Sequence, residues 1–418
     1  MKAARLPFYY GWIVVAGGAF HASFVLGSSH FALSAFLVPM EDELGWSTTL
    51  LFGALSLRQL LAALLGPIAG PLADRVGAPR IAFPVGVLLL GASLAAVRWT
   101  DHPVWFFFWY GGVGAVASSL VHLTMWEAVV LKWFSRRRAR ALLWTSVGEA
   151  SGPMVFPVLI TLLIALYGWR DAWLWYGVLT TATLLPFTLV LRTRPEQVGQ
   201  HLDGDATPVR PERPEAQVGA EQAVVQAAST DAGLTRNEAL RTRSFWLVAA
   251  AFTLTGIGVS GFQSHWIPHF RELGFGAGVA AAAVSVYGAS NIGSRILWGT
   301  LAARFPIRWL LTVHTAAAGA GVLFLLTLVN SSVTLFCWAI YQGLVLGSFF
   351  QLHALLSAEY FGRAHTGAIR GAMLPLASTT RGTGALLVGA LRDWRGSYTL
   401  AFLLVFGTWM VNSVLVAV

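Results

Sequence analysis

Long apolar stretches with few charges alternate with short polar segments along the chain, and this pattern predicts membrane-spanning helices. A helix needs about 20 mostly apolar residues to cross roughly 30 Å of hydrocarbon. We count twelve such stretches, so the sequence predicts an all-α integral membrane protein. They cover residues 9–38, 47–71, 81–98, 103–131, 141–166, 172–191, 244–269, 277–302, 307–329, 332–357, 367–391 and 398–417.

Composition supports a bilayer as the solvent. Of the 418 residues, 56% are apolar and 11% are charged, whereas a soluble domain has about 25% charged residues. A soluble protein of this length needs a charged and polar exterior, which this chain does not supply. The single cysteine, Cys337, excludes an intramolecular disulfide.

The sequence shows no primary energy source and no cofactor site. A Walker A loop requires Gly-Lys-Ser/Thr, and the only two lysines, Lys2 and Lys132, follow Met and Leu. We find no nucleophile, metal-ligand cluster or cofactor motif of a membrane enzyme. We therefore predict that the protein is not an enzyme and holds no cofactor and no metal.

Charged positions set the expected orientation, because cytoplasmic loops are enriched in Lys and Arg. Of the 28 Lys and Arg residues, 20 fall in the amino terminus or in and next to the loops after the even-numbered predicted helices, and five fall in or next to the opposite loops. The other three, Arg58, Arg295 and Arg381, fall well inside predicted helices. We predict that both termini are cytoplasmic and that the net charge of +9 reflects topology, not a nucleic-acid partner.

One long polar segment divides the chain. Residues 192–243 contain four prolines among scattered charges, a composition typical of disorder. The expected organisation is an amino-terminal six-helix bundle over 1–191, a disordered cytoplasmic linker over 192–243 and a carboxy-terminal six-helix bundle over 244–418.

The two halves carry an internal repeat. A shift of 229 residues places Glu43 on Glu272, and a shift of 232 residues places Glu149 on Arg381. Transporters are commonly built from related halves with the substrate site between them. Opposite charges at equivalent places favour a central polar site; a structural ion pair is the alternative. The same architecture fits alternating access better than a channel.

The loop at 70–80 reads Gly-Pro-Leu-Ala-Asp-Arg-Val-Gly-Ala-Pro-Arg and resembles the signature loop of the major facilitator superfamily. The resemblance implies twelve transmembrane helices in two pseudo-symmetric six-helix bundles. It also implies a latch on the cytoplasmic gate, formed by the loop residues Gly70, Asp74, Arg75 and Gly77.

Two further residues belong to the expected gate. Arg304 occupies the second copy of the loop, where Ala303 replaces the aspartate, so we expect an asymmetric latch. Glu127 lies near the cytoplasmic end of the fourth predicted helix. A pairing of Glu127 with basic residues of adjoining loops is favoured over substrate contact.

Four shorter motifs resemble those of the bacterial monocarboxylate porters and the oxalate/formate antiporters. They are Tyr-Tyr-Gly-Trp at 9–12, Glu-Leu-Gly-Trp-Ser at 43–47, Lys-Trp-Phe at 132–134 and Tyr-Gly-Trp-Arg at 167–170. Members of this branch bind a substrate carboxylate with an arginine of the eighth helix, often four residues after Asn or Asp.

The resemblance gives this role to Arg295, with Asn291 four residues before it and Tyr287 one turn earlier. Spacing of four puts these side chains on one helical face. Arg381 takes the place of the second cation of the oxalate-type members, as Arg where Lys is expected.

An arginine inside a membrane costs at least about 2.5–3.5 kcal/mol on insertion scales, so it needs a partner or a function. Guanidinium binds carboxylate through two parallel hydrogen bonds. Our hypothesis is that Arg295 is the principal carboxylate clamp. The alternative is a helix-packing arginine bound to a backbone carbonyl.

Three more residues are candidates for coupling or for the cavity charge. Protonating Glu149 would free Arg381, which offers a route to proton coupling or to a dianion. His30 is a candidate proton relay, and a structural histidine is the alternative; Phe31 aligns about as well with the same family position. Arg58 either lines the cavity or pairs with Glu149.

The predicted function is secondary active transport of small organic anions. The substrate is a monocarboxylate such as lactate, pyruvate or formate, or a dicarboxylate such as oxalate, moved by proton symport or by anion exchange. A multidrug or metabolite efflux pump and a carboxylate receptor are the alternatives. The expected partners are the substrate, protons or a counter-anion, and the lipid bilayer, with a monomer in the inner membrane.

Overall fold

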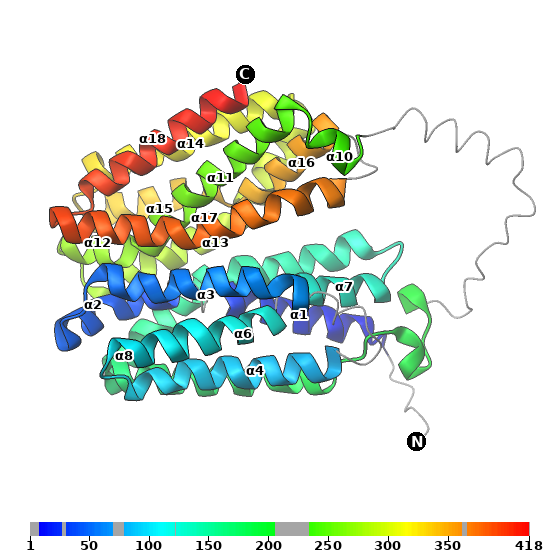
Figure 1. Cartoon of the computed structure of the whole chain (residues 1–418), viewed down its shortest axis with the longest axis horizontal. Helices are drawn as coiled ribbons and strands as arrows, with labels where there is room; N and C mark the ends of the chain where they lie inside the picture. The colour runs from blue at the N-terminus through cyan, green and yellow to red at the C-terminus, as the bar shows by residue number, and fades with distance from the viewer. Residues whose placement is uncertain are drawn as a thin grey trace, which may run out of the picture.

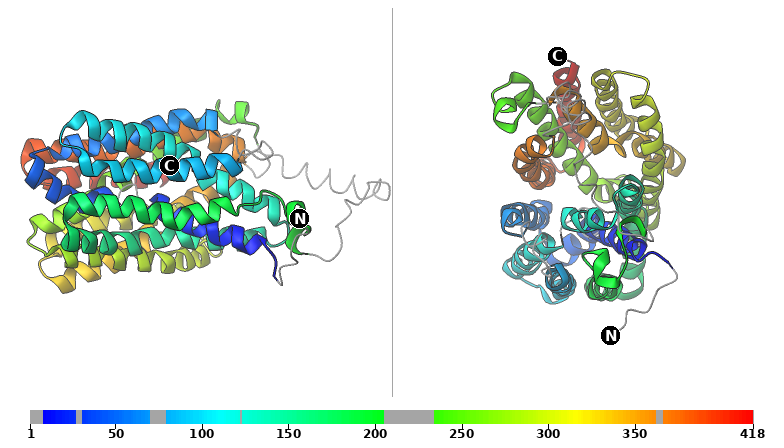
Figure 2. Two further views of the ribbon diagram at one scale, coloured as in Figure 1. Left: turned by 90° about the horizontal axis from the view of Figure 1, so that it is seen from below. Right: turned by 90° about the vertical axis from the view of Figure 1, so that its right-hand side faces the viewer.

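The computed structural model describes residues 8–26, 31–69, 79–121, 123–204, 234–361 and 366–417, in which all regular structure is helical. Two groups of helices lie side by side (Figure 1) and remain separate in the end-on view (Figure 2). The first group contains α1 (Gly11–Leu26), α2 (Ala32–Leu44), α3 (Thr48–Ala69), α4 (Pro79–Ala96), α5 (Pro103–Phe106), α6 (Gly114–Leu120), α7 (Leu123–Trp133) and α8 (Arg138–Leu189).

The second group follows the polar segment of the chain. It contains α10 (Arg236–Ala239), α11 (Arg243–Ser264), α12 (Trp266–Glu272), α13 (Ala277–Ala302), α14 (Ile307–Leu328), α15 (Ser332–Leu346), α16 (Phe349–Phe361), α17 (Thr366–Arg395) and α18 (Thr399–Ala417). Chains of this kind can satisfy every backbone polar group inside a bilayer, because each helix closes its own hydrogen bonds.

Helix bounds follow most of the predicted apolar stretches, with one informative difference. The first stretch was expected to end at residue 38, but α2 continues to Leu44, where Gly45 adopts φ 66° and its amide caps the helix on the Glu41 carbonyl at 2.9 Å. α8 runs through two predicted stretches and breaks at Gly168, with φ 76°. Within the described residues, seven helices are long and apolar enough to cross a membrane, and the count of twelve stays a prediction.

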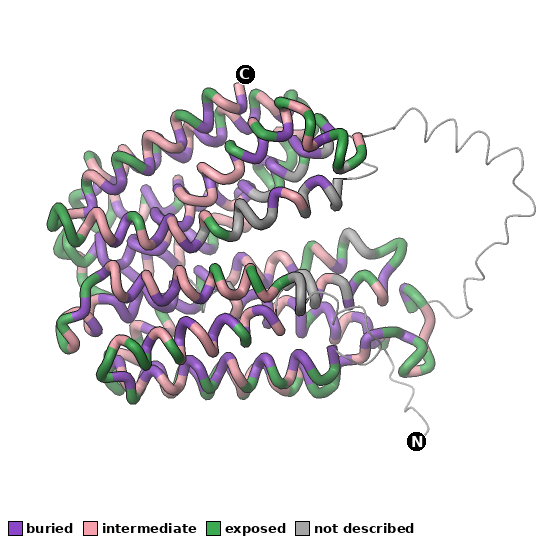
Figure 3. Tube along the Cα trace, in the orientation of Figure 1, coloured by how far each residue is buried: buried purple, intermediate pink, exposed green. Residues whose placement is uncertain are grey.

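Burial follows the helix faces. Buried positions lie on faces turned toward neighbouring helices, and exposed positions lie on the outer faces (Figure 3). Several of the most exposed side chains are large and apolar, among them Leu64, Ile81 and Val333. Lipid tails solvate such side chains as well as a protein core does, so these outer faces suit a bilayer.

Among the described residues, the main contacts between the two groups are those of α2 with α12, α3 with α17, and α8 with α13. Small residues allow the close approaches. A Cβ on Gly288 of α13 would lie 2.4 Å from the backbone nitrogen of Met154 in α8, and one on Gly382 of α17 would lie 3.1 Å from the Ser56 carbonyl oxygen in α3. The α8 and α13 backbones therefore touch beside the predicted substrate site.

The ends of the predicted linker are ordered, which corrects the expectation of disorder over all of 192–243. The Asp203 carboxylate accepts hydrogen bonds from the backbone amides of Ser135, Arg136 and Arg137 at 2.9–3.3 Å, just before α8 begins. Asp203 is 4% exposed and has φ 58°. A carboxylate at the start of a helix satisfies amides that lack helical partners, so this segment is fixed to α8. The α10 turn orders the other end.

The four short motifs meet in pairs, one pair at each end of the first group. Near the amino terminus, the Tyr9 hydroxyl donates to the Trp133 carbonyl oxygen, and the rings of Trp12 and Phe134 lie 5.1 Å apart. At the opposite end, the Glu43 carboxylate accepts hydrogen bonds from the Trp169 indole at 2.6 Å and from Arg170 at 2.9 Å. Motifs separated in sequence thus close the first group at both ends.

Candidate functional site

The predicted substrate residues lie along α13. The Asn291 side-chain nitrogen lies 3.2 Å from the Tyr287 hydroxyl oxygen and donates to it. Gln263, on α11, donates to the same oxygen at 2.7 Å. With two donors on its oxygen, the Tyr287 hydroxyl directs its own hydrogen elsewhere. Sequence reasoning missed Gln263, because no motif connects it to α13.

Arg295 crosses from the second group to the first. Its Nη1 donates to the carbonyl oxygen of Ser146 at 2.7 Å, and its Nη2 lies 3.8 Å from Oε2 of Glu149. Both partners are on α8. The Arg295 side chain is 14% exposed and that of Glu149 is 34% exposed. The third guanidinium nitrogen, Nε, is buried and has no acceptor in the part of the chain that the structure describes.

Glycines hold α13 and α8 in place around this contact. A Cβ on Gly347 would lie 2.4 Å from the Asn291 side-chain oxygen, so the chain between α15 and α16 packs directly on Asn291. On the other side, a Cβ on Gly148 would lie 2.1 Å from the Ala19 carbonyl oxygen of α1. Glu149 follows Gly148, so α1 fixes the part of α8 that carries the carboxylate.

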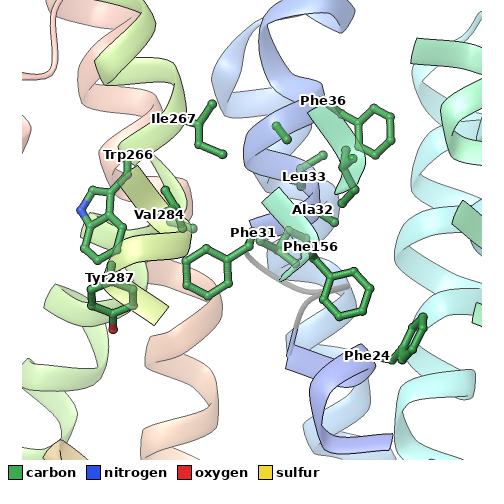
Figure 4. Packing of buried hydrophobic residues seen from close by; sticks show 14 of the residues in the cluster. Phe24, Phe31, Ala32, Leu33, Phe36, Phe156, Trp266, Ile267, Val284 and Tyr287 are labelled. Carbon is green, nitrogen blue, oxygen red and sulfur yellow. The ribbon is translucent and has the colours of Figure 1, made fainter. Parts of the chain in front are cut away.

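Aromatic side chains from both groups meet beside Tyr287 (Figure 4). The Trp266 ring packs edge-on against the Tyr287 ring with centroids 4.7 Å apart, and Phe31 of the first group lies 6.5 Å from Trp266. Phe31 is 2% exposed. These rings exclude water from one side of Tyr287, which strengthens its polar contacts.

The other predicted site residues are distributed as follows. Arg58 is 4% exposed in α3, with its Nε 3.0 Å from the Ser118 hydroxyl and its guanidinium 5.2 Å from the centre of the Tyr110 ring. These contacts lie within the first group, and the pairing of Arg58 with Glu149 stays a prediction. Glu127 is half-buried in α7, and Arg304 is exposed after α13. The predicted site residues that lie outside the described residues are Gly70, Asp74, Arg75, Gly77 and His30, together with the side chain of Arg381.

A second polar cluster joins the two groups at the end away from the termini. We call it the distal latch: Glu41, Thr48, Thr49, Glu272, Arg392 and Asp393. Figure 1 shows the ends of α2 and α17, which carry part of it, at the left. Sequence reasoning did not predict this cluster, because its members come from four separate segments.

Arg392 is the only cation among the latch residues. Its Nε lies 3.1 Å from Oε1 of Glu272, and its Nη1 lies 3.8 Å from Oε1 of Glu41 and 3.4 Å from Oδ1 of Asp393. Asp393 also accepts hydrogen bonds from the Thr49 amide at 2.7 Å and the Thr49 hydroxyl at 2.5 Å. The Thr48 hydroxyl donates to Glu41.

The latch carboxyls differ in their affinity for a proton. Burial raises the pKa of Glu41 above its usual value, although the Thr48 hydrogen bond and Arg392 oppose the shift. Burial likewise raises the pKa of Glu272 against the effect of Arg392. Burial also acts to raise the pKa of Asp393, but the hydrogen bonds from Thr49 outweigh it and lower that pKa. Protons therefore go to Glu41 or Glu272 before Asp393.

Comparison with known proteins agrees with this fold. The model of the Major Facilitator Superfamily matches residues 19–384, and the chain belongs to that family. Among solved structures, a peptide transporter POT in complex with sulfate has a TM-score of 0.71, with 16% identity over 99% of this chain and 95% of its own. A D-xylose-proton symporter has a TM-score of 0.69, with 13% identity over 98% of this chain and 97% of its own. At these identities the likeness concerns the fold.

Two curated relatives are closer in sequence. The oxalate:formate antiporter of Oxalobacter formigenes is 25% identical over 280 residues, which cover 66% of this chain and 59% of the antiporter. Monocarboxylate transporter 11 of Homo sapiens is 28% identical over 431 residues, covering 94% of this chain and 80% of the relative. The protein is therefore a membrane transporter of the major facilitator superfamily and not an enzyme.

Proposed function

We propose that the protein is a secondary active transporter of small organic anions and that Arg295 is the group that binds the substrate carboxylate. The observation that carries this proposal is the incomplete set of acceptors around Arg295. Its Nε is buried without an acceptor in the described structure, while Nη1 and Nη2 contact α8. A buried charged donor that lacks a partner is costly, and a carboxylate is the acceptor that guanidinium prefers.

Glu149 competes with the substrate in this proposal. The Glu149 carboxylate lies 3.8 Å from Nη2, so an incoming carboxylate that binds in a bidentate manner must displace it or bind beside it. Protonation of Glu149 removes its charge and releases the guanidinium. The site then accepts a monoanion together with a proton, which is symport; with Glu149 ionised, one anion replaces another, which is exchange.

The remaining predicted residues have supporting roles. Asn291 and Tyr287 hold the far end of a small substrate, and Arg381 adds the second cation that a dicarboxylate such as oxalate needs. Arg58 and His30 contribute to the charge and proton balance of the cavity. The relatives named for monocarboxylates and for oxalate and formate support this class of substrate.

Alternating access requires gates at both ends of the interface. We assign the cytoplasmic gate to the loop carrying Asp74 and Arg75, together with Glu127 and Arg304. The Lys and Arg distribution supports termini on the cytoplasmic side of an inner membrane. In this proposal the distal latch therefore faces outward. The bundles over 1–191 and 244–418 are the moving parts, joined by the linker, within a monomer.

Uptake of labelled lactate and oxalate into proteoliposomes with an inward proton gradient tests the proposal. The variants are Arg295→Ala and Arg295→Lys, and the matched control is Arg243→Lys, an exposed arginine at the start of α11. Loss of one partner of a buried charge pair weakens binding by about 2–5 kcal/mol, which is about 30-fold or more. We expect saturable uptake of at least one acid by the intact protein and by Arg243→Lys, and its loss in Arg295→Ala.

Three outcomes would contradict the proposal. If neither acid moves and the protein supports dye efflux, the protein is an efflux pump and Arg295 is structural. If Arg295→Lys fails to fold, instead of losing transport selectively, the packing role of Arg295 is favoured. Binding of an acid without uptake would indicate a receptor.

A further inference from the structure

The distal latch carries an imbalance of charge that the central site does not. Three carboxylates surround one guanidinium, with distances of 3.1 to 3.8 Å from Arg392 to Glu41, Glu272 and Asp393. Their side chains are 16%, 32% and 22% exposed. With all groups ionised, the described cluster holds two uncompensated negative charges in a partly dehydrated interface, which is unfavourable.

Within the described residues, no cation other than Arg392 forms an ion pair with the three carboxylates. Arg271, next to Glu272, donates to the Phe275 carbonyl oxygen at 3.3 Å. Glu43 and Arg170 pair with each other within the first group. Asp42, also at this end, is exposed and adds a further negative charge.

The floor of the latch is aromatic and neutral. Arg392 lies 6.0 Å from the centre of the Tyr398 ring. His265 is buried beneath Tyr398, with Nδ1 3.3 Å from its hydroxyl and Nε2 2.9 Å from the Ala385 carbonyl oxygen. His269 packs edge-on against Tyr398 and Phe402. A proton on His265 or His269 would bury a positive charge among aromatic side chains. The extra proton of the latch therefore binds a carboxyl.

We propose that the distal latch binds one proton, shared by Glu41 and Glu272, and that the two groups of helices close at this end only when that proton is bound. The latch joins α2 and α3 of the first group to α12 and α17 of the second. Opening separates the carboxylates and hydrates them, and closing brings them together around Arg392. Closing of the two groups of helices at the latch is thereby coupled to proton uptake.

The direction of the pH effect follows from the two states. In the closed latch, burial raises the pKa of Glu41 and Glu272, whereas hydrated carboxyls in an open latch have ordinary values. The closed state therefore binds a proton more tightly, and acid stabilises it. This is the opposite of a simple salt-bridge gate, in which acid would break the ion pairs and open the gate.

Access to Ser56 reports the state of this end. Ser56 of α3 lies inward of the latch, and its hydroxyl donates to the Gly382 carbonyl oxygen of α17 at 2.6 Å. In a Cys337→Ser background, Ser56→Cys introduces the single thiol with little change of volume. The probe is a membrane-impermeant methanethiosulfonate reagent, applied without substrate to the full-length protein in right-side-out vesicles.

Thiol reactivity decreases as the pH is lowered, because the thiolate is the reactive form. Each labelling rate is therefore divided by that of an exposed reference, Asn330→Cys, in the loop between α14 and α15. We expect the normalised labelling of the Ser56→Cys thiol to be about fivefold slower near pH 5.5 than near pH 8. Glu41→Gln and Glu272→Gln mimic protonated carboxyls, so each should give slow labelling with a weak pH dependence. Arg392→Gln removes the only latch cation and should give fast labelling at both pH values.

Glu43→Gln is the matched control, because Glu43 lies at the same end but bonds Trp169 and Arg170 within the first group. The hydrogen bonds from Trp169 and then Arg170 lower the pKa of Glu43, so it is ionised over this pH range. The Glu43→Gln variant should leave the pH profile of labelling unchanged. Faster labelling at low pH, a profile independent of pH, or an effect of Glu43→Gln as large as that of Glu41→Gln would overturn the proposal.

The experiment is independent of the transported anion. It rests on the proposed function only for the outward orientation of the distal latch, which inside-out vesicles check directly. Labelling that follows the latch prediction in a protein that moves neither lactate nor oxalate would reject the anion proposal alone. Uptake that depends on Arg295, with pH-independent labelling of the Ser56→Cys thiol, would reject the proton latch alone.

Discussion

Arg295 and Arg392 are both arginines of the second group that contact a carboxylate of the first, but their surroundings differ. Arg295 has one carboxylate partner in the described structure and a buried Nε without an acceptor. Arg392 has three carboxylates within 4 Å. The central site is therefore short of anionic groups and suits an incoming anion, whereas the distal latch has an excess of them and suits an incoming proton.

The comparison also separates two kinds of pH dependence. At the central site, proton binding to Glu149 removes a competitor of the substrate. At the latch, proton binding to Glu41 or Glu272 favours closure whether or not substrate is present. No described contact links Glu149 or Arg295 to the latch carboxyls, so variants of one region should preserve the direction of the pH effect in the other. Both regions join the same two groups of helices, and each therefore also biases how far these groups open.

Glu149→Gln should have the largest effect. The glutamine keeps the shape of the side chain but removes its charge, so the substrate no longer competes with an ion pair. Two unit charges about 4 Å apart attract by about 4 kcal/mol near a protein surface, and the partial exposure of Glu149 reduces this attraction. We therefore expect lactate or oxalate to bind about 10- to 100-fold more tightly near neutral pH. Isothermal titration over a range of pH measures this.

Labelling of the Ser56→Cys thiol should still be slower at acid pH when Glu149→Gln is added. The comparison fails if the variant binds acids as weakly as the intact protein, or if it abolishes the pH dependence of labelling. Full proton-driven accumulation in Glu149→Gln would remove Glu149 from the coupling mechanism.

Gly288→Ala should have an intermediate effect. Its Cβ would lie 2.4 Å from the backbone nitrogen of Met154, so α13 and α8 must separate near the contact between Arg295 and Glu149. Overpacking of this kind costs about 1–2 kcal/mol. A lower thermal midpoint in detergent and weaker binding of acids are expected.

Gly299→Ala is the control on the same helix, because a Cβ there meets nothing within 4 Å. Alanine is favoured over glycine within a helix by about 0.5–1 kcal/mol, so this variant should be as stable as the original or more so. Equal destabilisation by both changes would show that the α8 contact is not tight.

Gln263→Leu should have the smallest effect. It removes the donor 2.7 Å from the Tyr287 hydroxyl and leaves Asn291 as the only described donor to that oxygen. A single hydrogen bond contributes about 1 kcal/mol, so we expect about fivefold weaker binding of substrate. Gln263→Glu and Tyr287→Phe complete the series, measured by the same titration.

Thermal stability and the labelling profile of the Ser56→Cys thiol should be close to those of the intact protein in Gln263→Leu. If Gln263→Leu changes the latch profile as much as the binding constant, the two regions are not separate. If it changes neither, Gln263 does not position Tyr287.

Features that depend on local sequence were predicted, whereas features that depend on contacts between distant residues were not. Residues 277–302 were predicted as one helix and form α13 with the same bounds. The break at Gly168 matches the predicted loop between two stretches, because both follow from local composition. In contrast, the ordered turns at 195–204 depend on contacts with the start of α8, and their polar composition gave no sign of them.

The amino-acid sequence by itself determined the class of protein, the helical stretches and the alignment of Tyr287, Asn291 and Arg295 along one helix. Such features depend on hydrophobic length and on a repeat of about four residues, both of which are local. Only the tertiary structure decided that Glu149 meets Arg295, that Gln263 meets Tyr287 and that Arg392 lies among Glu41, Glu272 and Asp393. These partners are separated by up to about 350 residues, and helix packing, not spacing, brings them together.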